Sequence, residues 1–153
     1  MRERIARAMV NLGITLGQLG RGEEEIVAYR EVIARFGEST EPGVQEQVVR
    51  AMFNLAVTLG QLGRGEEEVA AYREVIAQFG ESAEPGVQEQ VARAMFNLAV
   101  TLGQLGKGEE EAAAYREVIA QFGESTEPRM REQVARAMVY LGVTVGQLGR
   151  GEE

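Results

Sequence analysis

Glutamate, arginine and tyrosine are the side chains through which this protein could carry out acid–base or electrostatic chemistry. Its 24 acidic residues are all Glu, its 16 basic residues are 15 Arg and Lys107, and His, Cys, Asp and Trp are absent. Without His or Cys, the chain lacks an imidazole general base, a thiol nucleophile and the ligands of a Cys/His zinc site. Without Asp, it also lacks the usual ligands of a calcium loop. We therefore expect no metal site and no cofactor.

The same side chains recur at a fixed interval of 43 residues. The tetrapeptide Gly-Gln-Leu-Gly begins at Gly17, Gly60, Gly103 and Gly146, and segments 44–86 and 87–129 differ at only five positions. A repeat of this length indicates an array of equivalent structural units. Active sites need one residue in a singular environment, whereas near-identical copies give every candidate several equivalent settings. We therefore expect that the protein is not an enzyme.

Each repeat is predicted to form a long helix followed by a short one. The apolar positions of the third long helix recur at steps of three or four residues, namely Val87, Val91, Met95, Leu98, Leu102 and Leu105. This is the period of an amphipathic helix. The short helix opens with Glu109–Glu111, whose charge suits the positive end of the helix dipole and favours a solvated first turn over a cation site. The predicted helices cover residues 2–19, 22–36, 41–62, 65–79, 84–105, 108–122 and 127–148.

These elements predict an all-α fold, an α-α superhelix of seven antiparallel helices in about three and a half repeats. A single helical hairpin cannot bury its own apolar face, so each unit must be stabilised by stacking on the next. We expect a single repeat domain over residues 1–153. Its units would cover about 1–40, 41–83 and 84–126, with a partial unit at 127–153.

The chain resembles the tetratricopeptide repeat (TPR) family, whose pattern is W-x2-L-G-x2-Y, then A-x3-F and then P over 34 residues. The first copy carries Met9, Leu12, Gly13 and Leu16 at the four leading positions. The later copies carry Met52, Leu55, Ala56, Leu59; Met95, Leu98, Ala99, Leu102; and Met138, Leu141, Gly142, Val145. Because its repeat is nine residues longer, the chain resembles a long-repeat (43-residue) subclass.

The short helices depart from the family pattern at one position of each copy. Tyr29, Tyr72 and Tyr115 match the packing aromatic residue, but Glu25, Glu68 and Glu111 replace the small Ala that precedes it by four residues. An unpaired buried charge would be costly. We therefore expect these carboxylates to turn outward or the hairpins to open.

The resemblance implies a scaffold that binds a protein or peptide in a concave groove lined by the long helices. The groove positions that it implies are Arg7, Asn11, Arg50, Phe53, Asn54, Arg93, Phe96, Asn97, Arg136 and Tyr140. An Asn amide can pair with one peptide unit, and Arg can bind a carboxylate through two parallel bonds. The expected partner is an extended segment, acidic or ending in a C-terminal carboxylate.

Packing within the array can explain the same residues without any ligand. Each groove arginine follows a Glu by four residues, the favourable order for a helical ion pair; the pairs are Glu3–Arg7, Glu46–Arg50, Glu89–Arg93 and Glu132–Arg136. The Asn side chains could bond between helices, and the Phe side chains could belong to the core. The alternative function is therefore an engineered or consensus-like structural array with no ligand, or a self-associating module.

Charge and hydropathy narrow the class of partner. A net charge of −8 and a pI near 4.8 argue against general binding of nucleic acid, which needs a basic surface. No apolar run approaches the roughly 20 residues that cross a bilayer. The chain does not begin with a signal peptide, so we expect a cytoplasmic protein without a membrane partner. The last helix would leave Met138, Leu141, Val145 and Leu148 uncovered, which predicts a homodimer through this helix.

Overall fold

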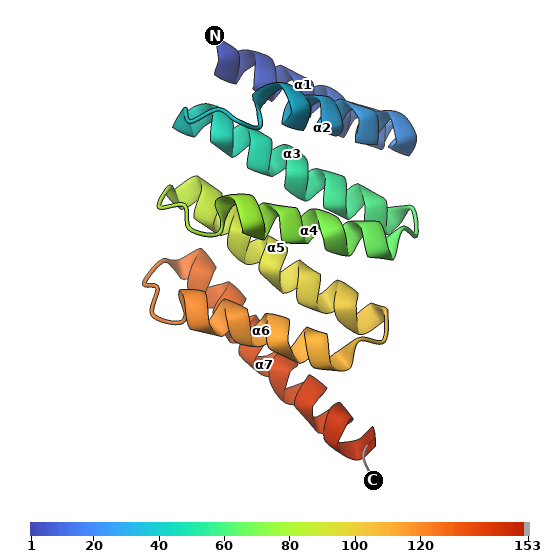
Figure 1. Ribbon diagram of the computed structural model, residues 1–153, viewed down its shortest axis with the longest axis vertical. Coiled ribbons are helices and arrows are strands. Elements are labelled where there is room, and N and C mark those ends of the chain that lie inside the picture. The colour runs from blue at the N-terminus through green and yellow to red at the C-terminus, as the bar shows by residue number, and fades with distance from the viewer. Residues whose placement is uncertain (152–153) are drawn as a thin grey trace. The chain divides into compact units, whose positions relative to one another are not determined.

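The computed structural model describes residues 1–151, which form α-helices that alternate between long and short (Figure 1). The helices are α1 (Arg2–Gln18), α2 (Gly22–Phe36), α3 (Pro42–Gln61), α4 (Gly65–Phe79), α5 (Pro85–Gln104), α6 (Gly108–Phe122) and α7 (Pro128–Gly151). These described residues contain no strand. The predicted all-α fold is confirmed, and the predicted ends agree with the observed ones to within one residue from α1 to the start of α7.

Two compact units make up the chain, Met1–Gln90 and Val91–Glu153, the second described as far as residue 151. In the first unit α1 packs on α2, α2 on α3 and α3 on α4, and α1 also contacts α3. In the second unit α6 packs on α7. Within each unit, these helices contact their neighbours in the sequence, which is the packing pattern of a helical solenoid. The single domain over the whole chain stays a prediction.

The hexapeptide Gly-Gln-Leu-Gly-Arg-Gly adopts two conformations. At 17–22 and 60–65 it ends a long helix, and its central glycine has a φ of 75° at Gly20 and 76° at Gly63, which favours glycine over any other residue. At 146–151 the same six residues continue α7 as helix to Gly151. The predicted end of the last helix at residue 148 is therefore wrong. Because the local sequence is identical, the hexapeptide by itself does not determine whether the chain turns or continues as helix.

The core of each repeat is centred on the tyrosine of its short helix. Three tyrosines are each only 1% exposed, namely Tyr29, Tyr72 and Tyr115. A Cβ atom at Gly13 of α1 would collide with the ring of Tyr29, so the glycine lets the ring approach the helix backbone. Tyr72 packs on Phe53 with ring centroids 5.9 Å apart and a tilt of 56°. Such tilted pairs contribute about 0.5–1.5 kcal/mol beyond the burial of their area.

The carboxylate of Glu25 is buried, and the expectation that it turns outward is wrong. The residue is 9% exposed, the Tyr29 hydroxyl donates to its Oε1 at 2.8 Å, and the Thr58 hydroxyl lies 3.0 Å from the same oxygen. Gly17 faces the carboxylate, and a Cβ there would collide with it. Two hydroxyl groups and the space at Gly17 thus accommodate a charge that would be costly without partners. Burial and the bond to Glu25 raise the pKa of Tyr29 well above its ordinary value, so the phenol stays a donor.

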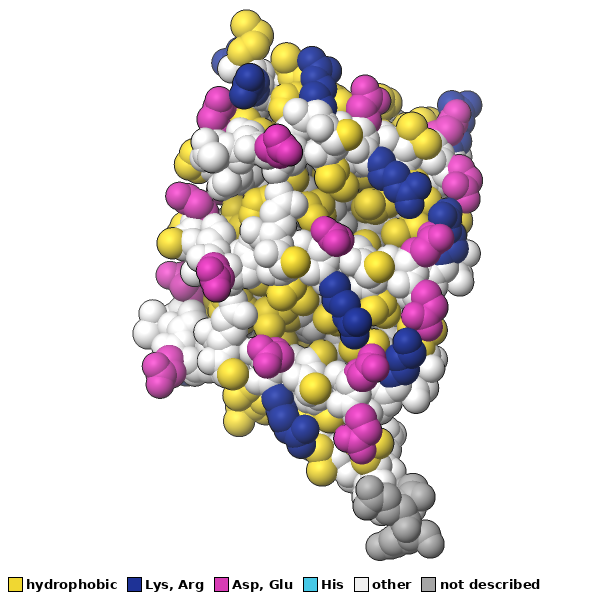
Figure 2. All heavy atoms as spheres, in the orientation of Figure 1, with side chains coloured by type: hydrophobic (Ala, Val, Ile, Leu, Met, Phe, Trp, Pro, Cys, Tyr) yellow, Lys and Arg dark blue, Asp and Glu magenta, His cyan; other side chains and the backbone are white. Residues whose placement is uncertain are grey.

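Charged side chains of both signs are mixed over the face shown in Figure 2. Within the first unit, Arg64 illustrates the pattern, because its Nε lies 2.6 Å from Glu67 and its NH1 group 3.4 Å from Glu23 of the preceding repeat. Exposed pairs of this kind contribute about 0–1 kcal/mol each. The ion pairs therefore add little to the stability that comes from the apolar core.

Replacing Tyr29 with Phe removes the shorter of the two hydroxyl contacts to Glu25. We expect Tyr29→Phe to lower the free energy of unfolding by about 1–3 kcal/mol, because a buried carboxylate loses a donor. The matched control is Tyr115→Phe, whose hydroxyl lies 3.5 Å from Glu111 and should matter less. Urea denaturation followed by circular dichroism measures both variants. Equal losses in the two variants would contradict the role assigned to Glu25.

Candidate functional site

A cavity of about 500 Å³ lies in the second unit, lined by α5, α6 and α7. Its lining includes Phe96 and Asn97 of α5, Glu111 and Tyr115 of α6, and Arg136 and Tyr140 of α7. Four of these residues, Phe96, Asn97, Arg136 and Tyr140, are positions assigned to the groove from the sequence. Two successive long helices thus bring groove positions to one cavity, and the short helix between them supplies the rest of its wall.

Three aromatic rings form one wall of this cavity. The ring centroids of Phe96 and Tyr115 are 5.7 Å apart, and those of Phe96 and Tyr140 are 5.4 Å apart, both pairs being tilted. Tyr115 and Tyr140 stack at 6.0 Å with an interplanar angle of 19°. Phe96 and Tyr115 are buried, whereas Tyr140 is 43% exposed. Tyr140 therefore offers the accessible part of the wall, an apolar ring with a polar hydroxyl at its end.

Arg136 supplies the positive charge of the cavity. Its guanidinium carbon lies 4.4 Å from the centroid of the Phe96 ring, a cation–π contact, and the side chain is exposed. A guanidinium stacked on a ring still directs its N–H groups outward in its own plane. The arrangement therefore holds Arg136 in a fixed orientation in which it can bind a carboxylate.

On the α6 side, the cavity has the negative charge of Glu111 next to the hydroxyl group of Tyr115. The Tyr115 hydroxyl lies 3.5 Å from Glu111 Oε2, and Gly103 leaves the space that this carboxylate occupies. Burial, reinforced by the charge of Glu111, raises the pKa of Tyr115 to about 12, while Arg136 acts in the opposite direction. The phenol is therefore protonated at neutral pH. The cavity combines one cation, one anion and an aromatic wall.

In the first unit, the groove positions of α1 are exposed. Arg7 donates to Glu3 Oε1 at 2.8 Å, the ion pair that its spacing predicts. Asn11, one turn further along the helix, is also exposed. Both side chains therefore remain accessible to a ligand, although Arg7 already has a carboxylate partner.

The groove positions of α3 are partly enclosed by the neighbouring short helices. Phe53 is 5% exposed and packs on Tyr72. Arg50 and Asn54 are half-buried, and both lie close enough to Tyr29 to lower the pKa of its phenol. These positions thus take part in packing between helices. On α5, Arg93 is exposed and Asn97 is half-buried.

The sequence did not assign Tyr115 or Glu111 to the groove. Tyr115 was expected in the core, which it also occupies, and Glu111 in the first turn of a short helix. One signal pointed to this end of the chain: Tyr140 stands where the two preceding copies have Asn54 and Asn97. The Tyr140 ring that stacks on Tyr115 therefore lies at a position where this copy differs from the two before it.

The described part of the chain contains neither a cluster of acidic side chains that could bind a metal ion nor a helix that could span a membrane. Its Glu side chains form no group of three that could hold a metal ion. None of its helices is both long enough and apolar enough to span a bilayer.

Profiles of the tetratricopeptide repeat match the chain at residues 5–38, 50–82 and 93–125. Each match begins within a long helix and extends through the short helix after it, so the matches coincide with the pairs α1–α2, α3–α4 and α5–α6. Together they cover more than half of the sequence. No curated protein matches the chain. Both the helix pairs and the profiles lead to one conclusion: the chain belongs to the tetratricopeptide repeat family, whose members serve as scaffolds for protein interaction and are generally not enzymes.

Proposed function

We propose that the protein binds an extended segment of a partner protein in the groove lined by its long helices, with the cavity of α5, α6 and α7 as the main contact. One observation carries the proposal. Four groove positions from two long helices line the same cavity of about 500 Å³, and two of them, Arg136 and Tyr140, are exposed. A cavity of this size is in the range of sites that hold a ligand, about 300–1,000 Å³.

The lining supports a particular chemistry for the bound segment. An apolar side chain would pack on the accessible ring of Tyr140, and an acidic side chain or a C-terminal carboxylate would bind Arg136. Glu111 repels a carboxylate on the α6 side of the cavity. The backbone N–H groups of the bound segment would therefore face Glu111, and the carboxylate of the segment would face Arg136 on the α7 side. The proposed partner is therefore an extended acidic segment or a free C-terminus next to an apolar residue.

Two substitutions on α7 test this proposal. Tyr140→Asn restores the residue found at this position in the two preceding copies, and Arg136→Gln removes the charge. For a peptide selected from an array of acidic sequences with free or blocked C-termini, we expect each variant to bind at least about tenfold more weakly by fluorescence anisotropy, since each anchor is worth more than 1 kcal/mol. The melting temperature should change little.

Arg116→Gln is the matched control, because Arg116 is an exposed arginine of α6 outside the cavity lining. Its affinity for the selected peptide should equal that of the parent protein. Selected peptides that bind all three variants equally well would contradict the proposed site.

A second proposal is self-association through α7, favoured by the apolar residues that this helix exposes. Their exposed fractions run from 44% to 67% for the set Met138, Val139, Val143 and Val145. At the corresponding positions of α5, Met95 and Leu102 are only 3% and 1% exposed. A second copy of the chain presents an equally apolar α7, so two such helices can pair about a twofold axis through the same surface.

Light scattering after size exclusion measures the oligomeric state. We expect a dimer at the highest soluble concentration, and a monomer for the double variant Met138→Glu, Val145→Glu, because two charges per chain would be buried at the interface. Val27→Glu, at an exposed apolar position of α2, is the control and should remain dimeric. A parent protein that is monomeric at every concentration would refute the dimer.

A further inference from the structure

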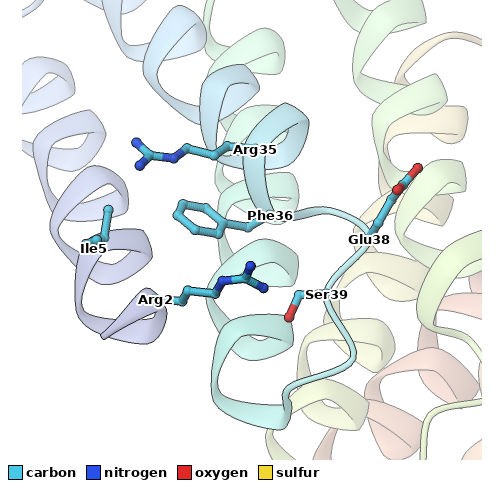
Figure 3. A pocket seen from close by; sticks show the side chains of 6 residues that line it. All are labelled: Arg2, Ile5, Arg35, Phe36, Glu38 and Ser39. Carbon is cyan, nitrogen blue, oxygen red and sulfur yellow. The ribbon is translucent and has the colours of Figure 1, made fainter.

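A second cavity, of about 430 Å³, lies in the first unit where the start of α1 meets the end of α2 (Figure 3). It is lined by Arg2, Ile5, Arg35, Phe36, Glu38 and Ser39. None of these residues belongs to the predicted groove. The cavity is therefore a separate feature, which the proposed function does not use.

The cavity combines two guanidinium groups with an apolar wall. Figure 3 shows Arg2 and Arg35 on opposite sides of the Phe36 ring, with Ile5 across from it and the carboxylate of Glu38 directed away from both arginines. The guanidinium carbon of Arg35 lies 5.3 Å from the ring centroid. Phe36 is buried and Ile5 half-buried, so the wall between the two charges is carbon.

Arg2 is held only loosely by the protein. Its NH1 group lies 3.9 Å from Glu41 Oε1, and the two side chains are 68% and 59% exposed. An ion pair so long and so exposed contributes almost nothing. A ligand with a higher charge than one carboxylate can therefore take the place of Glu41 at little cost.

Comparison of the copies shows that Arg35 is found only in the first copy, and that Arg2 has an arginine equivalent only in the last copy, Arg131. The equivalent positions of the second copy, 43 residues further on, are Gln45 and Gln78. The Gln45 amide donates to the Ser39 carbonyl oxygen at 3.2 Å, and the Gln78 amide donates to the Gly37 carbonyl oxygen at 2.7 Å. In the second copy, the Gln side chains at both positions thus hold the loop of the preceding repeat. The first copy carries a positive charge at both positions instead.

We propose that this cavity binds a phosphate monoester carried on an apolar group. Two arginines on one cavity favour a ligand with more than one negative charge, and a phosphate monoester carries about −1.5 to −2 at pH 7. A guanidinium group can donate two parallel N–H groups to its oxygens. The wall of Phe36 and Ile5 receives the carbon body of the ligand, and the cavity is of a size typical for small-molecule groups, about 300–1,000 Å³.

Phenyl phosphate is the probe that tests this proposal, added to the ¹⁵N-labelled full chain and followed by amide chemical shifts. We expect saturable shifts at Gly37, Ser39 and the first turn of α1, with a dissociation constant of about 1 mM. The double variant Arg2→Gln, Arg35→Gln carries the residues of the second copy at the same positions and so is compatible with the fold. Its affinity should fall at least about tenfold. Arg30→Gln, at an exposed arginine of α2 outside the cavity, is the control and should bind as the parent does.

Two other probes and one further variant distinguish the parts of the proposal. Phenylacetate and inorganic phosphate should each bind more weakly than phenyl phosphate, because one lacks the second charge and the other lacks the apolar body. Glu41→Gln should bind phenyl phosphate at least as tightly as the parent does, since Glu41 competes only weakly for Arg2. Equal binding of phenylacetate would overturn the choice of phosphate, and equal binding of inorganic phosphate would overturn the role of Phe36. Undiminished binding by the double variant, or weaker binding by Glu41→Gln, would overturn the site itself.

Discussion

The burial of one tyrosine in each short helix is the contact on which the rest of the structure depends. A short helix with its first turn full of glutamates can be held only through its apolar side, and Tyr29, Tyr72 and Tyr115 are the largest residues of that side, each almost wholly buried. Where Tyr29 meets α1, Gly13 allows the ring to approach the backbone. Where Tyr72 and Tyr115 meet α3 and α5, they pack on Phe53 and Phe96. The aromatic contact sets the distance between the two helices of a repeat, and hence the place of the polar residues around it.

The polar end of the tyrosine links the core to the surface that could bind a ligand. In the first repeat, the hydroxyl of Tyr29 is satisfied by Glu25, and Asn54 of the following long helix lies close to it. In the second unit, Tyr140 stands in place of that Asn and stacks on Tyr115. One substitution in the repeat thus replaces a polar side chain beside the tyrosine with an aromatic wall that is partly exposed. Arg35, where the next two copies have Gln, is a similar departure, so the individual features of this chain lie where its copies differ.

The helices could be predicted closely from the sequence, because apolar spacing and glycine turns agree from copy to copy and a proline begins each long helix from α3 onward. The end of α7 could not be predicted, since the hexapeptide at 146–151 is identical to the hexapeptides at 17–22 and 60–65, which form turns. The burial of Glu25 was also missed, because its donors, Tyr29 and Thr58, come from two different helices. Four residues that line the cavity in the second unit were anticipated on the long helices, namely Phe96, Asn97, Arg136 and Tyr140. Glu111 and Tyr115 on the α6 side were not anticipated. A buried residue such as Tyr115 can belong to the core and still line a cavity with the other edge of its ring.

The most direct measurement of the central claim is a map of amide chemical shifts for the full chain with a selected partner peptide bound. If the groove of the long helices is the binding surface, the largest shifts will fall in residues 96–104 of α5 and 136–147 of α7, with smaller ones around Glu111 and Tyr115. Shifts confined to the exposed outer faces of α2 and α4, with α5 and α7 unchanged, would contradict the account.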